Sequence, residues 1–65
     1  MKLKDIRLKK GYSRAKLSFY SGVAPKTIYN IECGITPWEQ VKLETYILLA
    51  RTLQVKVVDI VPEIK

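Results

Sequence analysis

Three glycines divide the first half of the sequence into short segments, and this spacing limits what the chain can fold into. A glycine directly after a run with helical periodicity is a common helix end, because it adopts a left-handed backbone without strain. The spacing predicts a first helix that ends at Gly11. A second helix, RAKLSFYS, then begins after the cap Ser13 and ends at Gly22, and a third runs from Pro25 to Gly34. The side chains expected to point inward are Leu3, Ile6, Leu17, Ile28, Ile31 and either Tyr20 or Ser21.

The stretch TPWE predicts the start of a fourth helix. Thr36 is the expected cap, Pro37 the first helical residue and Glu39 the reciprocal acid of a capping box. This helix is expected to run to about Leu53, either as one helix or as a short one followed by a long one. Its predicted inward residues are Leu43, Tyr46, Ile47, Ala50 and Leu53.

The tail QVKVVDIVPEIK is ambiguous from its residues alone. Its valines and isoleucines favour a strand by propensity, whereas their spacing also permits one helical turn before Pro62. Propensity by itself favours the strand.

Composition excludes several kinds of chemistry. The chain has one cysteine, Cys33, and no histidine, so neither an internal disulfide nor a structural zinc site is expected. The commonest general base is missing, and we expect no enzymatic activity, no metal and no cofactor. The 65 residues predict a single domain, residues 1–65, with a core so small that dimerisation is a plausible source of stability. No apolar run is long enough to cross a bilayer, so a cytoplasmic protein is expected, without a membrane partner.

The positive charge is concentrated near the N-terminus. The formal net charge is +6, but residues 1–26 contain eight basic side chains and one acidic one, a balance of +7. Residues 27–65 contain four basic and five acidic side chains, a balance of −1. A basic surface of this kind suits nucleic acid or an acidic membrane, although a solvated basic face that only keeps the protein soluble is an equal alternative.

Two predicted helices begin against the usual chemistry of a helix N-terminus. Arg14 and Lys16 fall in the first turn of the second helix, and Lys26 falls in that of the third, which also lacks a capping side chain. Each such cation costs about 0.3–1 kcal/mol against the helix dipole, and a missing cap costs about 1 kcal/mol. An external anion explains these choices, because a cation beside free N–H groups strengthens a phosphate site.

The segment from Ser13 to Gly34 resembles the phage Cro and repressor type of helix-turn-helix domain, also called XRE-like. The signature positions of that family are occupied by Leu17, Gly22, Val23, Ile28, Ile31, Glu32 and Gly34. The resemblance extends from Leu3 to about Val61. It implies an all-α, lambda-repressor-like fold of four to five short helices, in which a short fifth helix at about residues 57–61 is preferred over a C-terminal dimer strand.

The resemblance also implies roles for individual residues. Arg7 and Glu32 would form a structural salt bridge, while the third helix enters the major groove of double-stranded DNA. The residues implied to face bases are Pro25, Lys26, Thr27 and Asn30. Those implied to contact phosphates are Ser13, Arg14, Lys16, Tyr29, Thr36 and Trp38, with packing as the alternative for Tyr29 and Trp38.

The function implied is sequence-specific DNA binding by a transcriptional regulator, a repressor, that acts as a homodimer without a small-molecule effector. Two departures from the family concern readout: Arg14 replaces the usual glutamine, and Pro25 offers no hydrogen bond to a base. The alternatives are a protein-interaction or antitoxin-like module and an architectural or excision factor. The apolar residues that an interaction module would use are Phe19, Leu48, Val58, Val61 and Ile64, with loose core packing as the other explanation.

Overall fold

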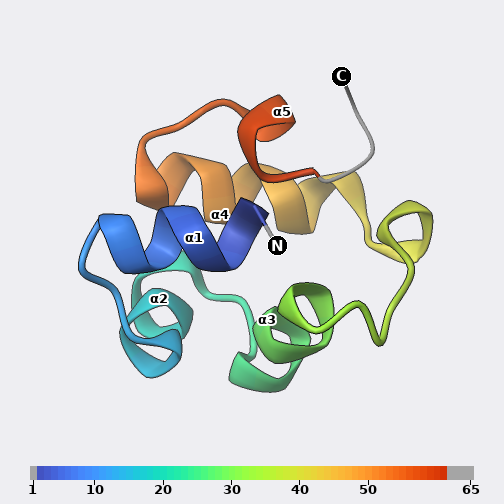
Figure 1. The fold of residues 1–65 in the computed structure, drawn as a ribbon, viewed down its shortest axis with the longest axis horizontal. Coiled ribbons are helices and arrows are strands. Elements are labelled where there is room, and N and C mark those ends of the chain that lie inside the picture. The colour runs from blue at the N-terminus through green and yellow to red at the C-terminus, as the bar shows by residue number, and fades with distance from the viewer. Residues whose placement is uncertain (1, 62–65) are drawn as a thin grey trace.

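The computed structural model describes residues 2–61, and within them the fold is built from helices alone (Figure 1). The elements are α1 (Lys2–Lys9), α2 (Arg14–Ser21), α3 (Pro25–Glu32), the 3-10 turn η1 (Trp38–Gln40), α4 (Leu43–Leu53) and α5 (Val57–Ile60). The all-α prediction is therefore confirmed, and the tail forms the short helix α5 rather than a strand. None of the helices in this described part is long and apolar enough to cross a membrane.

The ends of α2 and α3 follow the predicted signals. The Ser13 Oγ accepts a hydrogen bond from the main-chain N–H of Lys16 at 3.0 Å, which caps α2. Gly22 ends α2 with φ at 78°, a left-handed conformation in which any side chain is strained. Pro25 is the first residue of α3, whose cap position, Ala24, provides no side-chain hydrogen bond. The tight turn between the two helices fixes how α3 is presented beside α2.

The core is formed where the helices meet. Leu17, Val23, Ile28 and Ile31 are buried between α2 and α3, as the helix-turn-helix spacing predicts. Leu3 of α1 joins them, and Ile6 packs against this core while partly exposed. The structure also settles the choice in α2, since Ser21 is buried and Tyr20 is exposed. The Ser21 Oγ accepts the N–H of Val23 at 3.1 Å, so its polar atom is satisfied inside the turn.

The capping box predicted at Thr36 is wrong. The helical turn begins at Trp38, its cap position is Pro37, and no side chain caps it. The N–H of Thr36 bonds instead to the carbonyl of Asn30 at 3.3 Å, because the chain folds back onto the end of α3 after Gly34. Val41 is extended, which ends the turn and separates η1 from α4. Residues 37–53 therefore form a short helix and a long one, the second of the two alternatives.

The predicted inward face of α4 is partly wrong. Tyr46, Ala50 and Leu53 are buried as expected, but Leu43 is 65% exposed and Ile47 is 38% exposed. Leu49 is fully buried in their place. The helix begins only at Leu43, beyond the edge of the core, and its buried stripe is rotated toward Leu49.

The apolar residues suggested as a partner surface do not form one exposed set. Val61 is 1% exposed and belongs to the core, and Leu48 is partly buried against it. Phe19 and Val58 are exposed, whereas Ile64 lies outside the described residues. Val61 is buried because α5 folds back onto both α1 and α4 (Figure 1).

Candidate nucleic-acid interface

The first turns of α2 and α3 differ from those of the other helices. Neither contains an acidic residue. Every other helical element of the described chain has one in its first turn, and these acids are Asp5, Glu39, Glu44 and Asp59. Because α2 and α3 pack against each other, their two positive N-terminal regions belong to neighbouring elements. The potential of both helix dipoles is therefore reinforced by side-chain cations instead of being offset.

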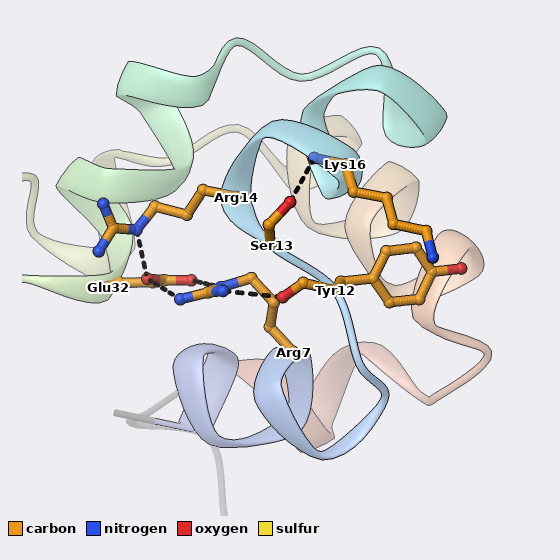
Figure 2. A network of polar contacts seen from close by, with 6 residues as sticks. All are labelled: Arg7, Tyr12, Ser13, Arg14, Lys16 and Glu32. Carbon is orange, nitrogen blue, oxygen red and sulfur yellow. Dashed lines mark hydrogen bonds and ion pairs between the residues drawn. The ribbon is translucent and has the colours of Figure 1, made fainter.

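A buried ion pair joins α1 to the end of α3. The Arg7 Nε donates to Glu32 Oε2 at 2.6 Å, and its Nη2 donates to Oε1 at 3.1 Å. The Arg7 Nη1 donates to the carbonyl of Tyr12 at 2.8 Å, so the guanidinium also holds the loop before α2 (Figure 2). The two side chains are 5% and 2% exposed. Such a pair is costly to break, since removal of one partner leaves the other as an unpaired buried charge.

Arg14 is already paired within the protein. This corrects the prediction from the sequence, in which an external anion explains the cation at this position. Its Nε donates to Glu32 Oε1 at 3.2 Å, and its guanidinium carbon lies 5.0 Å from the centre of the Tyr29 ring. Glu32 thus receives two guanidinium groups and neutralises one charge, which leaves the group of three with one net positive charge. The Arg14 side chain remains 43% exposed. The cation at this helix start is held by the protein and is still accessible.

Lys16 is exposed and lies over an aromatic ring. Its Nζ is 5.1 Å from the centre of the Tyr12 ring, as Figure 2 shows. Among the described residues the two ion pairs join Arg7 and Arg14 to Glu32, so neither Lys16 nor Lys26 has a carboxylate partner there. The Ser13 hydroxyl accepts the capping hydrogen bond and so keeps its own O–H available as a donor.

The outer face of α3 carries the residues expected to meet bases. Pro25 and Lys26 are exposed, and Thr27 and Asn30 are partly exposed. Lys26 and Asn30 lie away from the face that buries Ile28 and Ile31, whereas Pro25 and Thr27 lie at the edges of that face. Lys26 and Asn30 are four positions apart, which places their side chains one above the other on the helix. Within one short helix, then, a cation, an amide and a hydroxyl are presented outward.

Thr36 and Trp38 are positioned differently from the α2 and α3 residues. Thr36 is partly buried, and Trp38 packs against the core. The carbonyl of Trp38 accepts the Tyr46 hydroxyl at 3.1 Å. Burial, with a smaller contribution from Glu39, raises the pKa of Tyr46 above its ordinary value. The indole of Trp38 is therefore used largely for packing, and its predicted phosphate contact gains no support from this geometry.

Sequence reasoning missed the contact between Arg14 and Glu32. The two residues are eighteen positions apart, and Glu32 already had a partner in Arg7. One signal was present in the sequence, because a longer side chain, Arg14, stands where the family has glutamine. A long cationic side chain at that position can reach the end of α3.

The comparison with protein families agrees with this geometry. A family model described as helix-turn-helix matches residues 3–60, which is nearly the whole chain. No curated protein matches the sequence. No solved structure matches it either. With its α2–turn–α3 unit, its buried anchors and this match, the chain belongs to the helix-turn-helix family of DNA-binding domains, of the XRE or Cro and repressor type.

Proposed function

We propose that this protein is a sequence-specific regulator that represses transcription by occupying double-stranded DNA, with α3 in the major groove. The observation that carries the proposal is the pair of adjacent helix N-termini that contain cations and no acids. Such N-termini form anion sites, and phosphates are the anions that a DNA duplex presents at regular spacing. The protein would act in the cytoplasm, and no catalytic step is required.

The exposed residues divide into two roles. Lys26 is suited to donate to guanine O6 and N7, and Asn30 to form two hydrogen bonds with adenine. Thr27 would place its methyl group against a thymine methyl, and Pro25 would meet the groove wall. The proposed phosphate contacts are Ser13, Arg14 and Lys16 at the start of α2, Tyr29 through its hydroxyl, and Thr36 and Trp38 after α3.

A homodimer is the proposed binding form. One short helix reads only a few base pairs, so a second copy on a related half-site increases both affinity and specificity. Half-sites about 34 Å apart, one turn of the duplex, would present the major groove to both copies from the same side. Selection of bound duplexes from a random pool tests this arrangement, and the expected result is a palindrome with that spacing.

The dependence of DNA affinity on salt tests the phosphate contacts. If about three phosphates are neutralised per subunit, at a slope of about 0.9 per phosphate, a dimer should give a log–log slope near −5. Arg14→Gln should weaken binding to all sequences and make the slope shallower by about 1 per subunit. An affinity that does not change with salt, or no affinity for any duplex, would rule out the proposed function.

A second candidate function is a protein-interaction module. It is favoured by Phe19, which is 81% exposed, and by Tyr20, whose ring lies edge-on to Phe19 at 5.2 Å and is 61% exposed. Exposed aromatic side chains are typical centres of protein interfaces. For such a module, Phe19→Ser would abolish partner binding, whereas a DNA-binding regulator would retain its duplex affinity in that variant.

A further inference from the structure

We propose that Glu32 is a positioning residue for the contact between Arg14 and DNA phosphate. This inference rests on the proposed DNA binding and adds to it a residue that never touches the DNA. Glu32 has 2% of its side chain exposed and does not itself reach a phosphate, and of its two arginine partners only Arg14 is accessible at the surface. The same carboxylate that closes the scaffold pair with Arg7 would thereby orient the phosphate reader on the surface.

The contacts divide the Arg14 guanidinium into two parts. Its Nε is used by Glu32 Oε1 at 3.2 Å. Its two terminal nitrogens lie at the end of the side chain, beyond the guanidinium carbon, and Figure 2 shows a dashed line to neither of them. Within residues 2–61 neither terminal nitrogen has a hydrogen-bond acceptor. A guanidinium held at Nε still presents two parallel donors, which is the geometry that matches two oxygens of one phosphate.

Two further constraints fix the plane of the guanidinium. The ring of Tyr29 lies 5.0 Å from its central carbon, on the neighbouring helix α3. The carboxylate of Glu32 cannot rotate freely, because Arg7 binds both of its oxygens. The Tyr12 carbonyl therefore holds Arg7, Arg7 holds the carboxylate of Glu32, and that carboxylate orients Arg14. A side chain that is ordered before the phosphate arrives loses less conformational entropy when it binds.

The charges leave this arrangement attractive to an anion. One carboxylate faces two guanidinium groups, so a net positive charge remains. The more exposed member is Arg14, at 43% of its side chain, and this is where an incoming phosphate meets that charge. Glu32 orients Arg14 without cancelling its attraction.

Replacement of Arg14 by lysine and by glutamine separates the effect of the oriented guanidinium donors from the effect of the positive charge. Lysine retains the charge on a single nitrogen, which cannot bond to Glu32 and present two parallel donors to a phosphate at once. Arg14→Lys should bind an operator duplex about tenfold more weakly than wild type at fixed salt, and Arg14→Gln, which also loses the charge, should bind more weakly still. Its salt slope should stay at the wild-type value, whereas Arg14→Gln makes the slope shallower. Arg51→Lys, an exposed arginine in the last turn of α4, is the matched control and should bind as wild type does.

A double-mutant cycle then tests Glu32 itself. Glu32→Gln should weaken DNA binding in wild type and have little further effect in Arg14→Gln, because its influence passes through Arg14. A purely structural role would give the same loss in both backgrounds. Circular dichroism establishes whether Glu32→Gln is folded, and if it is not, Glu32→Asp, which keeps the carboxylate charge beside Arg7 but shortens its reach to Arg14, takes its place in the cycle.

Three outcomes are decisive. Weak binding by Arg14→Lys with an unchanged salt slope supports the positioning role. Wild-type affinity in Arg14→Lys overturns it while leaving the proposed function intact, because charge alone would then suffice. A wild-type protein that binds no duplex overturns the proposed function, and the positioning role with it.

Discussion

The first turns of the α2–α3 pair and of the α4–α5 pair carry charges of opposite sign. In α4 and α5 the first turn contains an acid, Glu44 and Asp59, and the Asp59 Oδ2 accepts the N–H of Lys56 at 3.0 Å. In α2 and α3 the first turns contain cations and no acid. Both pairs contribute to one core, so packing does not require the difference. The acids in the first turns of α4 and α5 are favoured by the helix dipole, whereas the cations in the first turns of α2 and α3 oppose it, as expected of helix ends that bind an anion.

The basic region, formed by α1, α2 and α3, uses its cations in more than one way. Glu32, at the end of α3, binds Arg7 and Arg14 together, whereas Lys16 and Lys26 have no acidic partner within the described residues. The basic region therefore contains three kinds of cation: one buried in the scaffold, one held at the surface and others exposed. Only the arginine held at the surface and the exposed lysines are expected to contact DNA.

The largest expected effect is on the scaffold cation. Arg7→Ala should lower the free energy of unfolding by about 3–5 kcal/mol, because it leaves Glu32 buried and deprived of its main partner. Chemical denaturation monitored by circular dichroism measures this loss. Loss of DNA affinity with unchanged stability would mean that Arg7 acts as a DNA contact, and the three kinds of cation would no longer be distinct.

A smaller effect is expected from the outer face of α3. Asn30→Ala should cost about 1–3 kcal/mol of binding energy on the preferred duplex and relax the preference at one base pair. Competition between the selected operator and its single-base variants measures both. An equal loss on every sequence would instead place Asn30 among the phosphate contacts.

Removal of the acid from the first turn of α5 should lower the stability of the fold and leave DNA affinity unchanged. Asp59→Ala removes the acceptor for the Lys56 N–H and should lower the free energy of unfolding by about 0.5–2 kcal/mol. DNA affinity, measured at a temperature where the variant is fully folded, should not change. A marked change in affinity would extend the DNA-binding surface to α5.

The smallest effect concerns Tyr46 at alkaline pH. Its pKa is raised in the folded protein above the ordinary value of 10.0 by burial and by Glu39. The unfolded chain then loses this proton at a lower pH than the folded chain, so stability is fully present below the ordinary pKa and falls as pH rises through the raised one. Unfolding measured between about pH 9 and pH 11 should show a steeper decline in wild type than in Tyr46→Phe.

Prediction from sequence was most successful where local chemistry decides the structure. Gly22 and Pro25 mark the turn between α2 and α3, and both positions were read correctly from the chain. The start of α4 is not predicted correctly from the sequence, because the extended Val41 and the folding back of Thr36 onto Asn30 depend on tertiary contacts. For the tail, propensity favoured a strand, and only the family resemblance indicated the helix that is observed.

The candidate site, like the fold, is predicted only in part by the sequence. The cations at the starts of α2 and α3 are visible in the sequence as violations of helix-capping preferences. The sharing of Glu32 by two arginines is not, because it depends on how α1, α2 and α3 meet. Local rules identify residues that are unusual, and only the fold shows what those residues contact.

The most direct test of the central claim is the replacement Lys26→Glu, with stability and DNA affinity both measured. An acid in the first turn of α3 should raise the free energy of unfolding by about 0.3–1 kcal/mol and at the same time weaken duplex binding strongly. Lys56→Glu, the same change of charge at the start of α5, is the control and should affect binding far less. If Lys26→Glu retains wild-type affinity, or loses no more affinity than Lys56→Glu, the cation at the start of α3 does not bind DNA.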